Sequence, residues 1–541
     1  MVAIFILTLI LRFYKLGGNP PAIYWDEAAI GVDAYALAET GKDQYGQPWY
    51  QAIFPSYGDY KAPFYIWLTA IPVKFLGLSE FSVRFPSAFF GSLTVLLTYF
   101  LVKELFSWSK NDPGSKLVLS LLSAFLLAII PWHFHFSRIG FESNLSLFWF
   151  VFCLWLFLKG LRKGFFLVLA SFCGAAAVYS YFSARVVLPV FVIFSCLIFF
   201  KKIWQKKFWF LIAMISSIVL LIPLFKSPLY ALSQQFRLST KNILTDQEPI
   251  IYSSKLVEQD NLSFLGRLFH HRYFYLGREF LINYFSHFSF QFLFLGGDEN
   301  LRHHSGFGGE LYLVLILPFL TGIYFLLKRH DKATFFIFAW LFSAPMAAAI
   351  SYEVPHSSRA IYMIIPLVII TAFGIISACH LISKKLRLLL FIFYFLVLTF
   401  NIFSYMHDYF VHYPQRGCRF WQDGYKQLMV YLKNKTNEYE EIYITDTYRL
   451  PYLYYIFYLK PQVEKIQLFQ EERLKLSGLF SGEPEKIDNV FFKLKQEVDL
   501  EKKTLYITSS PEQIKNFQLK DKINFIDDTQ AFFIFENAIP T

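Results

Sequence analysis

A succession of long apolar runs, separated by short polar loops, limits most strongly what this chain can fold into. A helix needs about 20 apolar residues to cross a membrane, and lengths of about 17 to 25 are usual. We expect about eleven such helices, over residues 1–14, 85–106, 117–134, 144–158, 164–181, 185–200, 208–225, 310–327, 333–351, 360–382 and 387–403. The expected fold class is therefore an α-helical polytopic membrane protein.

The composition agrees with this fold class and accounts for the positive charge. Of the 541 residues, 55% are hydrophobic and only 17% are charged, which is unusual for a soluble domain. The net charge of +11 comes largely from basic clusters between apolar runs: KGLRKG (159–164), KKIWQKK (201–207), KRHDK (328–332) and KKLR (384–387). Because cytoplasmic loops are rich in Lys and Arg, these clusters indicate membrane topology and no nucleic-acid partner. The five cysteines show no paired spacing, so we expect no disulfide framework.

The apolar run at 62–79 decides the predicted topology. If it crossed the membrane, the three basic clusters between 159 and 332 would lie outside, against the usual bias. Its residues Pro63, Pro72 and Lys74 suit an interfacial helix better. We therefore predict a plasma-membrane protein with its N-terminus inside and its C-terminus outside. The first run lacks a cleavage site and is interpreted as a retained span; its shortness leaves open a start upstream of Met1.

The tail beyond the last apolar run has a different pattern. It contains the strand-like segments EIYITD (441–446), TLYITSS (504–510) and AFFIFEN (531–537). A polar helical stretch precedes the first segment, and the helix-permitting stretch PEQIKNFQ (511–518) lies between the last two. We therefore expect a transmembrane domain over 1–403 and a small extracytoplasmic α/β domain over 404–541.

An acidic pair, Asp26 and Glu27, lies in the first outer loop, 15–84. It follows Asn19-Pro20-Pro21 and begins a predicted short helix over 26–41. Two interpretations are open: the pair complements the helix dipole, or one carboxylate near apolar surface acts as a general base.

Further ionisable residues fall on the predicted outer face. Lys61, close to Asp59, precedes the interfacial run and is either an interfacial anchor or a phosphate ligand. Arg138 and Glu142 lie four residues apart between two spans. They either form an ion pair with each other or belong to a functional site. The outward arginines Arg138, Arg185 and Arg359 suggest an anionic ligand, since the guanidinium donates two parallel hydrogen bonds.

Asp298, His303 and His356 are candidate contacts for substrate or metal, as is Asp59. Asp298 and His303 close the long outer loop, 226–309, and His356 lies in the next outer loop. The histidine spacings give no convincing ligand set. We expect no cofactor, and a divalent metal is a candidate without support.

With these residues identified, the chain resembles the C-type membrane glycosyltransferases. Within them it is similar to the branch of dolichyl-phosphate-mannose protein mannosyltransferases and the lipid A aminoarabinose transferase. The similar elements are the acidic pair Asp26-Glu27, the Lys61-Ala62-Pro63 element, and Ser137-Arg138 followed by Glu142. The chain departs from the protein mannosyltransferases in having Lys-Ala-Pro for His-Pro-Pro and Glu142 for Asp, and in lacking their large luminal insertion.

The resemblance implies an inverting transfer of a sugar from a polyprenyl-phosphate donor to a glycan, lipid or protein hydroxyl on the outer face. In this scheme Asp26 is the base, Glu27 and Glu142 orient Asp26 or the acceptor, and Lys61, Arg138, Arg185 and Arg359 bind the donor phosphate. The partners would be the lipid-linked donor, the acceptor and membrane lipids. The alternatives are a polysaccharide polymerase or O-antigen ligase, for which the loop at 226–309 is long enough, and a lipid flippase or transporter. A transporter predicts polar residues within the spans and paired broken helices.

Overall fold

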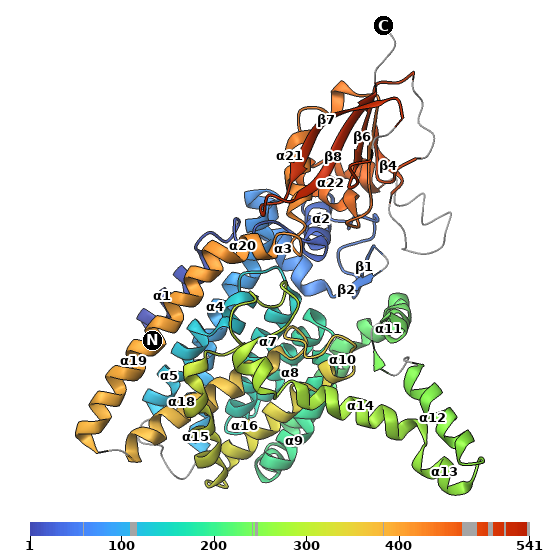
Figure 1. Cartoon of the computed structure of the whole chain (residues 1–541). Coiled ribbons are helices and arrows are strands. Elements are labelled where there is room, and N and C mark those ends of the chain that lie inside the picture. Colours follow the sequence, from blue (N-terminus) through green and yellow to red (C-terminus); the bar gives the residue numbers. More distant parts are fainter. Residues whose placement is uncertain are drawn as a thin grey trace. The chain divides into compact units, whose positions relative to one another are not determined.

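The computed structural model describes residues 1–57, 59–108, 116–240, 242–243, 247–381, 383–467, 484–495, 501–512 and 515–537. Contacts divide the chain into two compact units. The first unit comprises Met1–Arg12, Phe89–Ser137 and Glu142–Met406, and the second comprises Phe13–Ala88, Arg138–Phe141 and His407–Thr541. Figure 1 shows the whole chain, and each unit is described in turn.

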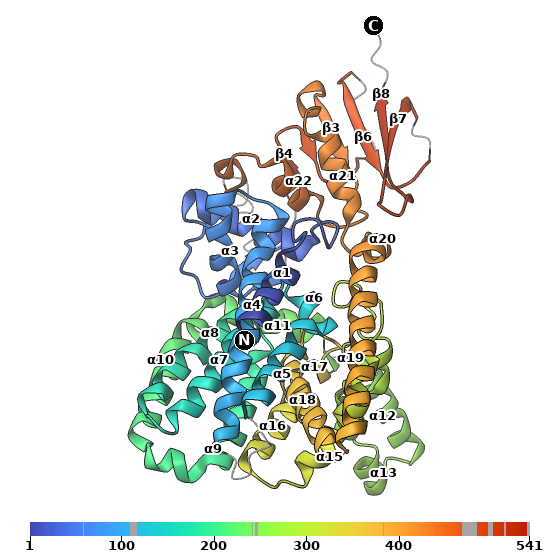
Figure 2. The ribbon, with the colours of Figure 1, turned by 90° about the vertical axis from the view of Figure 1, so that its left-hand side faces the viewer.

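The first unit is helical. Three of its α-helices, α1, α4 and α19, also have residues in the second unit. The helices are α1 (Val2–Phe13), α4 (Glu80–Leu105), α5 (Lys116–Ile129), α6 (Pro131–Phe136), α7 (Glu142–Gly160), α8 (Phe165–Ser180), α9 (Ala184–Gln205), α10 (Lys207–Lys226), α11 (Pro228–Thr240), α12 (Glu248–Gln259), α13 (Phe264–Phe269), α14 (Arg272–Ser286), α15 (Ile316–Leu327), α16 (Lys332–Ser343), α17 (Met346–Ala349), α18 (Ile364–Leu381) and α19 (Lys384–His407). Helices α7, α8 and α10 lie side by side, as Figure 2 also shows. The long outer loop, where no helix was predicted, contains α11 to α14.

Aromatic packing holds the interior of the first unit together. The ring of Phe150 on α7 lies 4.9 Å from the ring of Tyr362 and 5.7 Å from that of Trp340. Buried aromatic side chains of this kind supply large apolar area, and such ring pairs add about 0.5–1.5 kcal/mol each. These buried aromatic residues therefore serve helix packing.

Among the described residues, seven helices are long and apolar enough to cross a membrane, and five shorter apolar helices accompany them. Each of the expected spans overlaps one of these helices, so a helical polytopic membrane fold is confirmed. The number that cross stays a prediction. The ambiguous run forms α3 (Pro63–Leu76), a helix of 14 residues. At 1.5 Å per residue it spans about 21 Å, less than the hydrocarbon core of about 30 Å.

The second unit combines the first outer loop with the tail. The loop contributes α2 (Trp25–Thr40), β1 (Phe54–Ser56), β2 (Asp59–Lys61) and α3. The tail contributes α20 (Tyr413–Gly417), α21 (Asp423–Leu432), α22 (Pro451–Leu459), β3 (Glu441–Ile444), β4 (Lys486–Ile487), β5 (Val490–Phe491), β6 (Thr504–Thr508), β7 (Phe517–Asn524) and β8 (Gln530–Asn537). The predicted boundary at residue 404 stays a prediction.

The tail builds a six-stranded sheet in the order β4-β5-β3-β6-β8-β7. Strand β3 runs parallel to β5 and β6, and the other pairs are antiparallel. Figure 1 shows α21 and α22 beside this sheet. The three predicted strands and the small α/β domain are confirmed. A helix at 511–518 is wrong for the described residues, because a turn at 515–516 leads directly into β7.

Helix α2 packs closely against α22 of the tail. A Cβ atom added at Gly31 of α2 would lie 2.7 Å from the ring of Phe457 on α22 and 3.0 Å from Val83. Such distances are shorter than van der Waals contact, so only glycine fits here without displacement of a neighbour. This contact fixes α2, and with it the acidic pair, against the tail.

Candidate active site

The acidic pair lies in the first turn of α2, which begins at Trp25. Carboxylates are favourable there because the unbonded amides give the helix N-terminus a partial positive charge. The backbone amide of Trp25 donates to Oε1 of Gln422 in the tail, 3.2 Å away. Both interpretations of the pair therefore remain compatible with its position in the helix.

The β1–β2 hairpin brings Lys61 and Tyr57 to Asp26. Strands β1 and β2 pair with Phe54 opposite Lys61, and Tyr57 lies in the turn between the strands. The Lys61 ammonium and the Tyr57 hydroxyl both donate to Oδ1 of Asp26. Nζ of Lys61 also lies 3.3 Å from the Tyr57 hydroxyl and 4.0 Å from Oδ2 of Asp59. The predicted residues Asp26, Lys61 and Asp59 are thus brought together, with Tyr57 added.

These contacts keep Asp26 ionised. Burial raises the pKa of Asp26, but the Lys61 ammonium and the hydrogen bonds from Lys61 and Tyr57 outweigh burial and bring it below its usual range. The side chain of Lys61 is only 6% exposed, whereas that of Asp26 is 25% exposed. The carboxylate is therefore charged, held by a cation, and reachable from solvent.

Glu27 has a different environment from its neighbour. It is fully buried, and both its oxygens lie 3.0 Å from guanidinium nitrogens of Arg84. Its Oε1 also accepts from the backbone amide of Gly140, 2.5 Å away. Arg84 in turn donates to the carbonyl oxygens of Leu16 and Pro20. Through these contacts Glu27 stabilises the fold of the first outer loop. Its predicted role in orienting Asp26 stays a prediction.

Arg138 is fully buried in the second unit. Its Nη2 donates to the carbonyl oxygen of Asn19 at 3.0 Å, and its guanidinium lies 5.0 Å from the ring centre of Phe410. These contacts tie Arg138 to the turn that precedes α2. A phosphate role for this residue stays a prediction.

The remaining predicted residues belong to the first unit. Glu142 is the first residue of α7, and Arg185 lies in the first turn of α9 with its guanidinium 4.0 Å from the ring of Phe182. Arg359 is half-buried, and its backbone amide lies 3.4 Å from Nδ1 of His356. Their roles toward acceptor and donor stay predictions.

Asp298, His303 and His356 form a buried cluster in the first unit. Oδ2 of Asp298 lies 3.2 Å from Nδ1 of His303 and accepts from the backbone amide of Ser357 at 2.8 Å. Burial raises the pKa of Asp298, but His303 and the bonded amides lower it below its usual value. The candidate metal contacts are thus brought together, except Asp59, which lies in the second unit.

Two residues of the site were missed from the sequence. Tyr57 is one of 34 tyrosines and carries no local signal. Arg84 had a signal, because a charged residue at the start of an apolar span needs a partner. Its partner, Glu27, lies 57 residues earlier.

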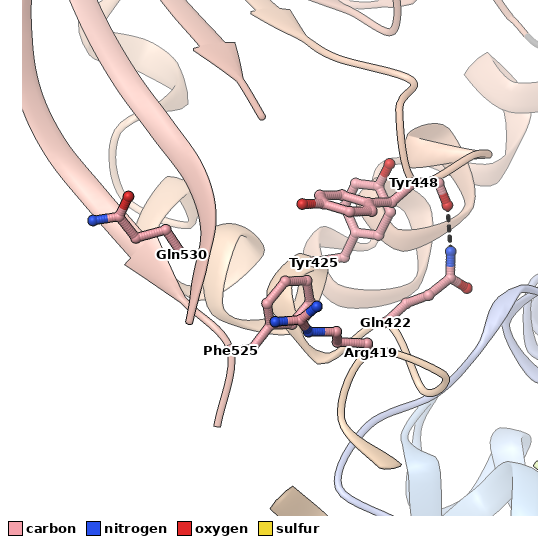
Figure 3. A pocket seen from close by; sticks show the side chains of 6 residues that line it. All are labelled: Arg419, Gln422, Tyr425, Tyr448, Phe525 and Gln530. Carbon is pink, nitrogen blue, oxygen red and sulfur yellow. Dashed lines mark hydrogen bonds between the residues drawn. The ribbon is translucent and has the colours of Figure 1, made fainter. Parts of the chain in front are cut away.

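A pocket lies in the tail part of the second unit (Figure 3). It has a cavity volume of about 120 Å³ and is lined by Arg419, Gln422, Tyr425, Tyr448, Phe525 and Gln530. Gln422 connects the pocket to α2, since its Oε1 accepts from the Trp25 amide and its Nε2 donates to the carbonyl of Tyr448. The pocket therefore combines aromatic side chains with amide and guanidinium groups.

Comparison with known sequences identifies a family for part of the chain. Residues 60–225, which include Lys61, match the model of the family described as dolichyl-phosphate-mannose-protein mannosyltransferase. No curated protein matches the chain.

Solved structures resemble the chain over nearly its whole length. ArnT from Cupriavidus metallidurans in the apo state has a TM-score of 0.55 at 12% identity, over 99% of this chain and 98% of that chain. The same protein bound to undecaprenyl phosphate gives 0.53, with the same identity and coverage. An oligosaccharyltransferase of Archaeoglobus fulgidus, tethered with an acceptor peptide, gives 0.52 at 12% identity, over 94% of this chain and 68% of that chain. The chain therefore has the fold of the C-type membrane glycosyltransferases and, over residues 60–225, the sequence pattern of their mannosyltransferase branch, as its outer-loop motifs predicted.

Proposed function

We propose that the chain is an inverting membrane glycosyltransferase that moves a sugar from a polyprenyl-phosphate donor to an acceptor hydroxyl on the outer face. The observation that carries this proposal is the contact of Asp26 with Lys61 and Tyr57. The family match over 60–225 supports the reaction class, and the bound undecaprenyl phosphate and tethered acceptor peptide of the similar structures support the kinds of substrate.

The reaction is a single displacement at the anomeric carbon. The acceptor oxygen forms a bond to that carbon from the face opposite the phosphate, and the bond between carbon and phosphate oxygen breaks. The electron pair of that bond leaves with polyprenyl phosphate, and the acceptor proton passes to the Asp26 carboxylate. Phosphate is a good leaving group, so the step needs a base and cations but no general acid.

The Asp26–Lys61 ion pair explains how the base becomes active. In the free protein Lys61 lowers the pKa of Asp26, and a carboxylate of low pKa is a weak base. A donor phosphate beside Lys61 would share the ammonium, weaken its pull on Asp26 and raise the pKa of Asp26. Donor binding would thus strengthen the base at the moment it is needed.

The acceptor and the other cations complete the proposal. The pocket that Gln422 connects to the start of α2 offers polar and aromatic groups that could bind an acceptor. Arg185 and Arg359 of the first unit are further candidate ligands for an anionic group. The active site and the tail lie on the extracytoplasmic side in this scheme.

Donor turnover by purified protein in detergent tests the proposal. The wild type, Asp26→Asn and the control Asp446→Asn would receive a panel of polyprenyl-monophosphate sugars with a membrane extract as acceptor source. Asp446 is an exposed aspartate of the same unit that follows β3. Mass spectrometry would follow liberated polyprenyl phosphate and glycosylated product.

We expect turnover by the wild type and Asp446→Asn, and a loss of at least about 100-fold in Asp26→Asn. If Asp26→Asn retained its turnover, the transferase activity would stand, but Asp26 would be excluded as the catalytic base. Consumption of a pyrophosphate-linked donor alone would favour a polymerase or ligase instead.

A further inference from the structure

We propose that Asp298, His303 and His356 bind one divalent cation, for which zinc is the best match, and that this cation joins two loops of the first unit. One ligand atom from each residue lies within 4.8 Å of the others, and all three residues are buried. The inference is independent of the transferase reaction, because it concerns the metal content of the protein.

The donor set selects the kind of cation. Two imidazoles and one carboxylate form a common zinc set, whereas magnesium and calcium prefer oxygen ligands alone. Zinc bonds of about 2.0–2.1 Å in a tetrahedron place ligand atoms about 3.3 Å apart. Nδ1 of His303 and Oδ2 of Asp298 are already 3.2 Å apart.

The third ligand needs only a small adjustment. The rings of His303 and His356 stack with centroids 4.5 Å apart and an interplanar angle of 28°. Small side-chain rotations would therefore bring a nitrogen of His356 to the tetrahedral separation from the other two ligand atoms. A fourth position would remain for water.

Backbone groups already orient the cluster. Oδ1 of Asp298 accepts from the amide of Asn300 at 2.9 Å, and Oδ2 accepts from the amide of Ser357 at 2.8 Å. The amide of His356 donates to Nε2 of His287, 3.1 Å away. Outer contacts of this kind hold metal ligands in place and typically change metal affinity about 10- to 100-fold.

A neighbouring carboxyl group gives a second, independent observation. Glu310 is fully buried, and its Oε1 lies 3.3 Å from the backbone nitrogen of Asp298. Its Oε2 has no hydrogen-bond partner among the described residues. An unbonded buried carboxyl oxygen is costly, and water on a cation at the cluster would give it a partner.

The cation would have a structural consequence. Asp298 and His303 lie in the loop that precedes α15, and His356 lies in the loop between α17 and α18. A shared ion would connect these loops and fix the segment that carries Arg359. Binding to the folded state alone would also raise stability.

Metal analysis of the purified full chain tests the inference. Zinc would be added during purification, free metal removed, and bound metal counted by mass spectrometry; chelated protein would then be titrated with Co²⁺ and its visible absorption recorded. The variants are Asp298→Asn, His303→Gln and His356→Gln. The control is His271→Ala, an exposed histidine of the same outer loop.

We expect about one metal ion per chain and tetrahedral Co²⁺ absorption bands in the wild type and in His271→Ala. Each ligand variant should bind at least about 100-fold more weakly. A wild type that takes up neither zinc nor Co²⁺ would overturn the inference, even if a variant fails to fold. Metal binding that persists unchanged in all three variants would overturn it as well.

Discussion

At the scale of single residues, the proposed function depends on how Lys61 controls the pKa of Asp26. In the wild type the Lys61 ammonium and two hydrogen bonds hold the pKa of Asp26 below its usual value. The base must be ionised to accept a proton, so activity falls only when the pH drops below that pKa. With Asp26 as the base, we therefore expect the acid limb of the pH–rate profile at unusually low pH in the wild type.

Lys61→Met should move this limb. Loss of an adjacent cation raises the pKa of a carboxyl group by roughly 1–3 units, so the acid limb of kcat/KM should move up by roughly as much. Lys61→Arg, which keeps the positive charge, is the matched control, and its acid limb should stay at the low pH of the wild type. The profile would be measured by donor turnover from pH 3 to 9. The wild type should show no acid limb in this range, whereas Lys61→Met should show one, because burial then raises the pKa of Asp26 without the opposing ammonium. Activity of Lys61→Met that stays level down to pH 3 would show that Asp26 is not the titrating base.

How far these residues were predictable follows from their separation in the sequence. Asp26 and Lys61 share one outer loop, so topology and motif sufficed to propose them together. The Glu27–Arg84 pair depends on how the loop folds back onto α4, which no local spacing reveals. The same holds for His303 and His356, 53 positions apart, whose stacked rings belong to two different loops.

At the scale of elements, the position of Asp26 depends on the packing of α2 against α22. The sequence pattern predicted the start of α2 and the strands of the tail, because apolar periodicity and capping are local. It did not predict that α2 would pack against the tail. That contact is visible only in the structure, where Gly31 leaves no room for a Cβ atom beside Phe457.

Gly31→Ala should therefore lower the thermal stability of the protein. Its added methyl group would displace Phe457 or Val83, and overpacking of this kind costs about 1–3 kcal/mol. The matched control is Gly277→Ala on α14, where nothing lies within 4 Å of the added Cβ, so stability should hold or rise slightly. In a Phe457→Ala background, Gly31→Ala should lower the thermal stability much less, because the ring that the methyl group displaces is gone. Thermal unfolding in detergent would measure all four variants, and equal costs in both backgrounds would refute the contact.

At the scale of the whole molecule, the outer-face mechanism depends on the predicted topology. That topology depends on whether α3 lies at the interface, and its length does not decide this, because the expected span α5 has the same 14 residues. Its exposed Phe75 and Leu76, with Lys74 beside them, are what an interfacial helix presents to lipid and headgroups. If α3 instead crossed, every loop after it would change sides.

Cysteine labelling can decide between these topologies. In the predicted scheme Lys42→Cys, before α3, lies outside and Lys163→Cys, in the loop between α7 and α8, lies inside; both positions are exposed. A membrane-impermeant maleimide applied to intact cells should therefore label Lys42→Cys at once and Lys163→Cys only after permeabilisation. Glu512→Cys, exposed after β6, should behave like Lys42→Cys because the tail is predicted outside.

The pair at 42 and 163 is diagnostic because α3 lies between them. If α3 crossed the membrane, the same number of other spans would separate the two positions, and one additional crossing would place both on the same face. Equal labelling of both in intact cells would thus make α3 a span and put the basic clusters outside. Opposite labelling would place Asp26 and Lys61 on the face where a lipid-linked donor and an outer acceptor can meet.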